Sequence, residues 1–466
     1  MGSKFETRLL GELCHEITVG FVGTMTNEYI ENGIPFLRSK NIEEYDVKWD
    51  DMKYVSSAFH KKLSKSVLKP GDVAIVRTGK PGTTCVIPND LREANCSDIV
   101  IARVNNELLC PHYLSYFMNA MAHGQVNAHI VGAVQQHFNV SSAKKLEIPL
   151  PSRVQQTKIV QVLKTLDDKL KLNRQINQTL EQMAQTLFKS WFVDFAPVVD
   201  NALDAGFFEQ DLAFSDELLR RVEARKAVRE SDGFNPLSED IRQLFPDAFE
   251  ECAEPTLGLG GWIPKGWTIS ALDKIANFQN GLALQKFRPD SENDEYLPVL
   301  KIAQLRQGYC DANEKSKIDI IESCRVYNGD MIFSWSGTLM IDIWTGGDAA
   351  LNQHLFKVTS KNYPLSFYYH WTNHHLARFQ HIAAAKAVTM GHIKKGDLSS
   401  SYCVVPTTQV LSYFDSITGS YLEQAKSVRL QCNTLTNLRD TLLPKLISGE
   451  LSLSDIKIDN PEETLI

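Results

Sequence analysis

Membrane-spanning and secretory segments are missing from the sequence. No apolar run approaches the roughly 18–20 residues that a spanning helix needs, and the N-terminus has no apolar segment of the kind found in signal peptides. The nine cysteines are an odd number without a Cys-x-x-Cys pair. They favour reduced thiols over a disulfide framework or a structural zinc. We therefore expect a cytoplasmic protein that has no membrane partner.

Common catalytic motifs are also missing. The sequence has no Gly-x-Gly-x-x-Gly, no Gly-x-Ser-x-Gly, no Asn/Asp-Pro-Pro-aromatic tetrapeptide and no convincing carboxylate–lysine nuclease cluster. His370 and His374 have the helical spacing of a metal site, but no Glu lies between them to act as a general base. Packing or surface histidines are the better interpretation. We expect no catalytic residue, no metal site and no cofactor site in this chain.

Acidic residues are concentrated in two parts of the chain, although the total charge is only −7. Residues 194–254 hold 16 acidic and 6 basic residues, a net charge of −10. Residues 450–466 hold 5 acidic and 1 basic residue, a net charge of −4, which leaves +7 for the rest of the chain. A mildly basic remainder permits DNA binding without requiring it.

Two parts of the chain repeat each other at a separation of about 255–263 residues. Both copies contain short β-like runs punctuated by Pro and Gly, together with one helical pattern, so each is predicted to be a compact α+β domain. A duplicated domain suggests a molecule that touches two separate places on one partner. The matching segments are Ile34–Ile42 with Leu297–Leu305, Leu68–Gly79 with Val326–Gly337, and His137–Pro151 with His392–Pro406.

A long apolar-periodic segment follows each copy. Ser152 and Gln155 predict a capping box at the start of the first segment. Positions recurring every seven residues favour helices that pack lengthwise, and a whole domain between them allows antiparallel pairing as a coiled coil. Each helix of about 35 residues would be roughly 50 Å long. The recurring residues are Ile159, Leu166, Asn173, Leu180 and Leu187 in the first helix, and Phe414, Tyr421, Val428, Leu435 and Leu442 in the second.

Two residues interrupt these apolar patterns. Asn173 is either a buried amide that sets the register or a position that faces water. Pro444 lacks a backbone N–H group and should kink or end the second helix.

Polar and basic residues on predicted loops are the candidates for DNA contact. Arg and Lys suit guanine edges or phosphates, whereas Asn and Gln suit adenine edges. Residue types differ between the copies at matching positions, which fits two sites that read different sequences; ordinary surface loops that drifted after duplication are the alternative. The candidates are Arg38, Lys40, Asn41, Arg77, Thr78, Lys80, Gln135, Gln136, His137 and Asn139 in the first copy, and Lys301, Gln304, Arg306, Ser334, Trp335, Ser336, Met390, His392 and Lys394 in the second.

The whole architecture resembles the specificity subunit of type I restriction–modification systems. The segments that carry the resemblance are Leu187–Pro197, Leu244–Phe249 with Trp262–Trp267, and Leu442–Leu451. The resemblance implies a non-catalytic subunit with two target recognition domains, each reading one half of an asymmetric, bipartite double-stranded DNA site. It also implies spacer helices that dock two modification subunits, which bind S-adenosylmethionine and methylate adenine. Separate motor-nuclease restriction subunits would cut the DNA.

The expected α+β organisation has six parts: a first target recognition domain (1–151), a first spacer helix (152–192), an acidic connecting region (193–261), a second target recognition domain (262–406), a second spacer helix (407–449) and a C-terminal tail (450–466). Two other functions stay open. Binding of S-adenosylmethionine by the purified chain would favour a DNA methyltransferase or nuclease in its own right. A coiled-coil adaptor for proteins or sugars should fail to bind duplex DNA even with modification subunits present.

Overall fold

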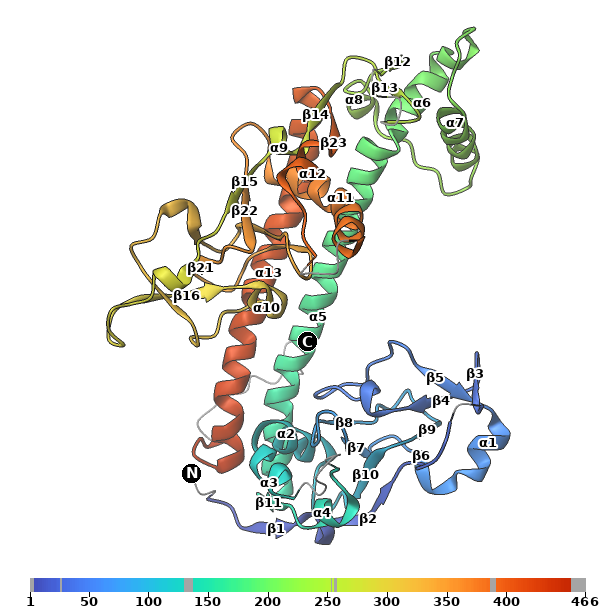
Figure 1. Ribbon diagram of the computed structural model, residues 1–466. Helices are drawn as coiled ribbons and strands as arrows, with labels where there is room; N and C mark the ends of the chain where they lie inside the picture. The colour runs from blue at the N-terminus through green and yellow to red at the C-terminus, as the bar shows by residue number, and fades with distance from the viewer. Residues whose placement is uncertain are drawn as a thin grey trace, which may run out of the picture. The chain divides into compact units, whose positions relative to one another are not determined.

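The computed structural model describes residues 4–25, 27–129, 137–252, 254, 258–385 and 391–453. Its chain forms two compact units, one of residues 1–171 with 434–466 and one of residues 172–433. Two long helices, α5 (Arg153–Phe188) and α13 (Thr408–Ser448), contribute residues to both units (Figure 1). Among the described residues, no helix is long and apolar enough to cross a bilayer.

The first unit contains a four-stranded antiparallel sheet of order β2-β10-β7-β8 and a five-stranded sheet of order β3-β5-β4-β9-β6. Strands β4 and β9 are parallel, and β1 pairs separately with β11. Strand β7 is wholly buried and apolar, as expected of a central strand. The strands are β1 Thr7–Leu9, β2 Cys14–Val19, β3 Tyr29–Ile30, β4 Ile34–Leu37, β5 Lys53–Val55, β6 Val67–Leu68, β7 Val73–Val76, β8 Thr84–Val86, β9 Ala94–Cys96, β10 Ile99–Val104 and β11 Glu147–Pro149; the short helices are α1 Ser57–Lys62, α2 Pro111–Met121, α3 His123–Ala128 and α4 Val140–Lys144.

The second unit repeats this topology. Its four-stranded sheets have the orders β15-β22-β19-β20 and β17-β16-β21-β18, β16 and β21 are parallel, and β14 pairs with β23. The duplication predicted from the sequence is thus confirmed in the strand order. The strands are β12 Phe249–Glu251, β13 Trp262–Pro264, β14 Thr268–Ala271, β15 Asn277–Asn280, β16 Tyr296–Leu300, β17 Lys315–Lys317, β18 Arg325–Val326, β19 Met331–Ser334, β20 Met340–Ile343, β21 Ala349–Leu351, β22 Leu355–Thr359 and β23 Tyr402–Val405; the helices are α6 Ala196–Asp204, α7 Asp216–Arg229, α8 Glu239–Arg242, α9 Leu272–Ile275, α10 Ile302–Gln307, α11 Leu365–Ala385 and α12 Lys395–Ser399.

The long helices α5 and α13 have 36 and 41 residues, so each is about 55–60 Å long. The predicted capping box begins α5, because the Gln155 amide N–H donates to Ser152 Oγ at 3.3 Å and the Ser152 amide N–H donates to Gln155 Oε1 at 3.1 Å. In the second unit Asn173 contacts Gln431, and the Phe188 ring lies 6.3 Å from the Phe414 ring. Later residues of one helix therefore meet earlier residues of the other, which confirms antiparallel pairing.

The two interruptions in the helical patterns have different outcomes. Asn173 is only 1% exposed and its Nδ2 donates to Gln431 Oε1 at 2.7 Å, so it is a buried amide and does not face water. Helix α13 continues past Pro444 to Ser448, so the expectation that it could end at the proline is wrong. Leu446 and Ile447 are buried in the core of the first unit and stabilise the last turn.

The acidic residues 194–254 fold onto the core of the second unit. Phe207, Phe245 and Phe249 are buried there with Phe192 and Trp267. The charges on α6 and α7 compensate each other. The Arg225 guanidinium, for example, donates to both Asp200 oxygens at 2.8 and 2.5 Å.

Candidate nucleic-acid interface

Asp98 brings two of the three candidate segments of the first domain together. Arg77 Nη1 donates to Asp98 Oδ1 at 2.9 Å, and Thr78 Oγ1 donates to Asp98 Oδ2 at 2.7 Å. From the other segment, Ser39 Oγ donates to the Asp98 carbonyl oxygen at 2.9 Å. Asp98 has a φ of +53°, a left-handed conformation that Asp tolerates better than most residues. The loops after β4 and β7 therefore lie side by side.

The third segment of the first domain joins the same surface. The Phe138 amide N–H donates to the Arg77 carbonyl oxygen at 3.1 Å, and Arg77 Nε donates to the Phe138 carbonyl oxygen at 3.3 Å. His137 and Asn139 thus flank the residue that pairs with Arg77. Asn139 Oδ1 caps helix α4 by accepting from the Ser142 amide N–H at 2.9 Å, so its side chain shapes the loop. Gln135 and Gln136 lie outside the described residues.

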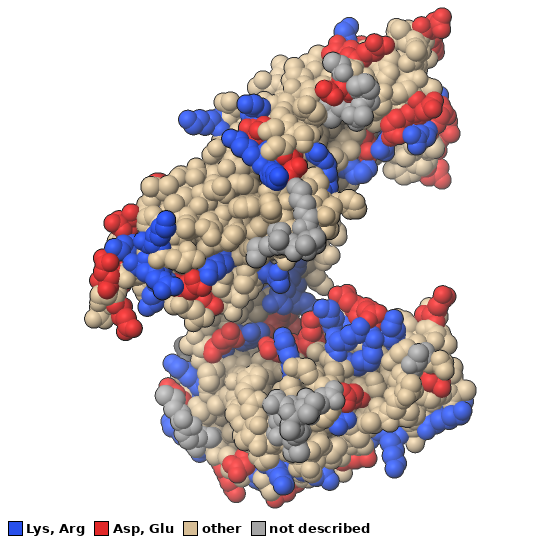
Figure 2. Space-filling view, in the orientation of Figure 1, with Lys and Arg blue, Asp and Glu red and all other residues tan. Residues whose placement is uncertain are grey.

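Arg38 and Lys40 add positive charge to this surface, and a single carboxylate faces both. Arg38 Nη2 lies 3.3 Å from Asp51 Oδ2, Lys40 Nζ pairs with the same oxygen, and Lys53 Nζ lies 3.0 Å from Oδ1. Hydrogen bonds from Lys40 and then Lys53 hold the pKa of Asp51 well below its usual range. On the face shown in Figure 2, Lys and Arg atoms of this unit are interspersed with Asp and Glu atoms.

Two of the first-domain candidates have different surroundings from the rest. Asn41 is fully buried: its Oδ1 accepts from the Arg38 amide N–H at 3.1 Å, and its Nδ2 donates to the Lys48 carbonyl oxygen at 3.1 Å. It therefore holds the loop that presents Arg38. Lys80 is exposed at the turn after Gly79.

The candidate segments of the second domain also converge. The Gly337 amide N–H donates to the Gly391 carbonyl oxygen at 2.9 Å, and Ser336 and His392 form an antiparallel bridge. Arg306 Nη2 donates to Thr338 Oγ1 at 2.9 Å, which brings in the segment after β16.

The other second-domain candidates vary in exposure. Lys301 and Gln304 are half-buried, Lys394 is exposed just before α12, and Ser334 is fully buried, with its Oγ donating to the Ser336 carbonyl oxygen at 3.1 Å. Met390 lies outside the described residues.

Two residues that the sequence analysis did not single out occupy the centres of these surfaces. Asp98 directly precedes β10, and His354 directly precedes β22, the equivalent strand. His354 Nδ1 lies 3.2 Å from Ser336 Oγ, and its ring lies 5.9 Å from that of Trp335. A polar residue immediately before an apolar central strand is the sequence signal that could have found both.

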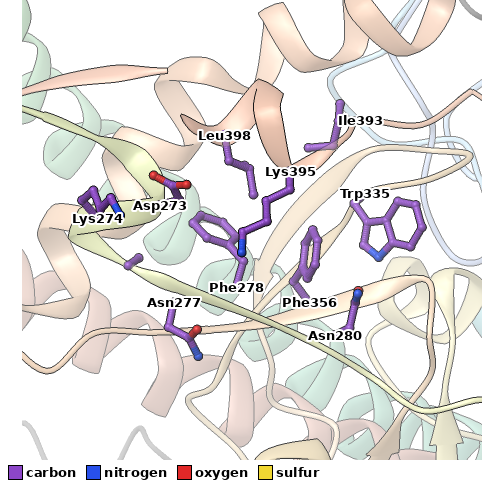
Figure 3. A pocket seen from close by; sticks show the side chains of 11 residues that line it. Asp273, Lys274, Asn277, Phe278, Asn280, Trp335, Phe356, Ile393, Lys395 and Leu398 are labelled. Carbon is purple, nitrogen blue, oxygen red and sulfur yellow. The ribbon is translucent and has the colours of Figure 1, made fainter. Parts of the chain in front are cut away.

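Trp335 also borders a recess of about 440 Å³ in the second domain (Figure 3). The Phe356 ring lies 5.8 Å from both the Trp335 and the Phe278 rings, and Lys395 extends into the recess toward Phe278. Trp335 follows β19 as Arg77 follows the equivalent strand β7. The same place in the fold thus holds an aromatic side chain in one domain and a paired guanidinium in the other.

His370 and His375 of α11 pack against the aromatic core, whereas His374 and His381 are exposed. His370 is 3% exposed and stacks on Phe188 at 5.3 Å, and burial lowers its pKa to about 4. Burial likewise lowers the pKa of His375 to about 4. Across the described residues, no group of three or more His, Cys, Asp or Glu side chains could hold a metal ion. All nine cysteines are free thiols.

Each unit joins its domain to the helices through an arginine of α13. In the first unit Arg439 Nη1 lies 3.0 Å from Asp167 of α5, and Tyr116 of α2 donates to the same carboxylate at 2.5 Å. In the second unit Arg429 donates to both oxygens of Asp342 in β20, at 2.6 and 2.7 Å. Of the residues predicted to recur along the helices, four are buried (Ile159, Asn173, Leu180 and Phe414) and six are half-buried (Leu166, Leu187, Tyr421, Val428, Leu435 and Leu442).

Two equivalent domains, each with one polar loop surface and each joined to a pair of antiparallel helices, define a recognition scaffold. The family model of the type I restriction modification DNA specificity domain matches residues 2–182 and 264–423, and the chain belongs to this family.

Individual relatives extend over most of the chain. It is 23% identical over 451 residues to the type I restriction enzyme MjaIX specificity subunit of Methanocaldococcus jannaschii. This match covers 93% of this chain and 90% of the relative. It is 24% identical over 415 residues to the HindI specificity subunit of Haemophilus influenzae, with 83% and 88% covered. The crystal structure of a type I restriction–modification S subunit from M. genitalium has the same fold, with a TM-score of 0.52, 11% identity and coverage of 95% and 96%.

The chain is therefore the DNA specificity subunit of a type I restriction–modification system. The family is non-catalytic, which decides against a methyltransferase or nuclease in its own right. Membership in a DNA specificity family likewise decides against an adaptor that does not bind DNA.

Proposed function

We propose that the two domains read the two halves of one asymmetric, bipartite double-stranded DNA target. The observation that carries this proposal is the construction of the same three-loop surface twice with different side chains. Arg77 and Asp98 in the first surface correspond to Trp335 and His354 in the second. A shared frame with different polar groups suits the reading of two different base sequences. The recognition domains are residues 1–151 and 262–406.

The paired helices, residues 152–192 and 407–449, set the separation between the half-sites in this proposal. Their length of about 55–60 Å equals about 16–18 base pairs at 3.4 Å per base pair. Half-site centres one to one and a half turns apart fit such a spacer. Residues 193–261 connect the two halves of the chain.

The partners in this proposal are two modification subunits and separate motor-nuclease restriction subunits, in the cytoplasm. The modification subunits bind S-adenosylmethionine and receive the target adenine, which must leave the base stack to be methylated. Only +7 remains outside the two acidic segments, so enclosing modification subunits would supply many of the phosphate contacts.

Mapping methylated adenines in DNA from cells that express this chain with its modification subunit tests the proposal. The expected pattern is methylation at one bipartite sequence, whose two short parts differ from each other and are separated by a constant number of unspecified base pairs. Cells that lack this chain should show no such methylation. A single uninterrupted target, or a pattern independent of this chain, would contradict the proposal.

A further inference from the structure

In both domains the first residue after one strand is a cation that faces a carboxylate 13 residues further along. Arg38 follows β4 and pairs with Asp51 at 3.3 Å. Lys301 follows β16 and pairs with Glu314. Both cations are candidates for DNA contact, and neither carboxylate was predicted to have a role. The two cations therefore occupy equivalent places, and each has a carboxylate partner, in two surfaces whose other side chains differ.

The two carboxylates do not occupy equivalent positions in the fold. The strand register places Glu314 at the position of Lys53, and not at that of Asp51. The two copies thus make the same contact from different positions.

The loop around Asp51 holds its carboxylate in place. Arg38 Nη2 also donates to the Asp51 carbonyl oxygen, and Asn41 Nδ2 donates to the Asp50 carbonyl oxygen at 3.3 Å. Asp51 has a φ of +51°, which only a few residue types besides glycine adopt readily. With its pKa well below the usual range, the carboxylate keeps its charge wherever DNA binding is measured.

A negative charge in a surface that meets DNA repels phosphates of every sequence, so it lowers non-specific affinity. A carboxylate kept in both surfaces must therefore have a compensating effect. Pairing fixes the orientation of a long cationic side chain, which reduces the entropy that is lost when the side chain contacts a base. It also neutralises part of the charge that would otherwise bind any phosphate.

We propose that Asp51 and Glu314 are positioning residues that orient Arg38 and Lys301 and restrain their attraction for phosphates, so that each sets the sequence discrimination of its own half-site. This role rests on the proposed reading of one half-site by each domain. Side-chain exposures of 20% for Arg38 and 36% for Lys301 leave part of each cation accessible to DNA.

The test uses the full chain in complex with its modification subunits and measures binding by fluorescence anisotropy at roughly 0.1 M salt. The duplexes are the methylation-mapped target, the target altered in either half, and an unrelated sequence. Asp51→Asn removes the charge and retains a residue that tolerates positive φ. One additional phosphate contact should tighten binding to the unrelated duplex roughly eightfold. The ratio of the affinity for the target to the affinity for an altered duplex should fall by a similar factor for alterations in one half only. Glu314→Gln should lower this ratio for alterations in the other half.

Glu12→Gln is the matched control, because Glu12 pairs with Arg8 at 3.3 Å in the same unit and neither residue is a candidate for DNA contact. It should leave both measurements unchanged. Unchanged values for Asp51→Asn, an effect equal in both halves, or weaker binding to every duplex would overturn the role of the carboxylate. A wild-type complex that does not prefer the mapped target over either altered duplex would instead overturn the proposed function itself.

Discussion

Individual side chains in the two polar loop surfaces hold the loop framework, face outward, or do both. Asn41 and Asn139 use their amides to hold loop backbone, one fully buried and one as a helix cap. Arg77 does both, because its Nε donates to the Phe138 carbonyl oxygen at 3.3 Å and its Nη1 pairs with Asp98, while 16% of its side chain stays exposed. Exchanging Arg77 should therefore alter the outward surface and also the contact between the loops after β7 and before α4.

Arg77→Ala should weaken recognition of one half-site only. A good bidentate contact to a base contributes about 1–3 kcal/mol, or roughly 5- to 150-fold in affinity. The measurement is binding of the complex to the mapped target and to duplexes altered in either half. Discrimination should decline within one half and persist in the other.

Arg8→Ala is a suitable control for Arg77→Ala, because it removes the same charge from the same unit at a residue of β1 that pairs with Glu12, four residues further along. It should leave discrimination in both halves intact. An equal loss of affinity for sites altered in either half would show that Arg77 does not read one half-site.

The sequence predicted which residue types form these surfaces but not how they are paired. Arg38, Arg77 and Trp335 follow apolar strands, and that pattern is local. Their partners Asp51, Asp98 and His354 come from other segments, and only the strand order brings them into contact. No local pattern contains that information.

At the scale of the helices, the seven-residue pattern and capping box predicted the long elements well, because both depend on spacing along one segment. Of the two outcomes expected at Pro444, a kink or an end, the end does not occur, since tertiary burial of Leu446 and Ile447 outweighs one lost hydrogen bond. The sequence predicted an acidic connecting region at residues 193–261. It did not predict that aromatic side chains of this region, including Phe207 and Phe249, complete a core whose other members lie far away in the sequence.

Asn173 is the polar residue in the seven-residue apolar pattern of α5. Its effect on the register of the helix pair can be measured separately from its effect on stability. Asn173→Leu replaces a buried amide with an apolar side chain, which should raise the free energy of unfolding by about 1 kcal/mol. The same change should loosen the register, so that methylation occurs at targets with more than one spacer length. Thermal unfolding and methylation mapping measure the two effects.

Asn177→Leu supplies the matched control. Asn177 is 8% exposed, and its Oδ1 has no hydrogen-bond partner among the described residues. This change should also stabilise the helices but leave the spacer unchanged. A less stable Asn173→Leu protein with a single spacer length would show that the Asn173–Gln431 contact contributes stability and does not set the register.

For the whole molecule, antiparallel pairing links the lengths of the two helices. Asn173 meets Gln431 and Phe188 lies near Phe414, so the partner of Gln178 lies close to Ala425. Seven residues inserted after Gln178 alone would leave the added turns without partners. They should displace one of these contacts and impair assembly of the complex with the modification subunits.

Seven residues inserted after both Gln178 and Ala425 should instead lengthen the helix pair with its apolar pattern intact. The added length is about 10 Å, or roughly three base pairs of DNA. Methylation mapping should then show the same two half-sites separated by about three more base pairs. Because the recognition domains are unaltered, a change in the half-site sequences is not expected. An unchanged spacer in an assembled, active complex would mean that the helices do not measure the distance between half-sites.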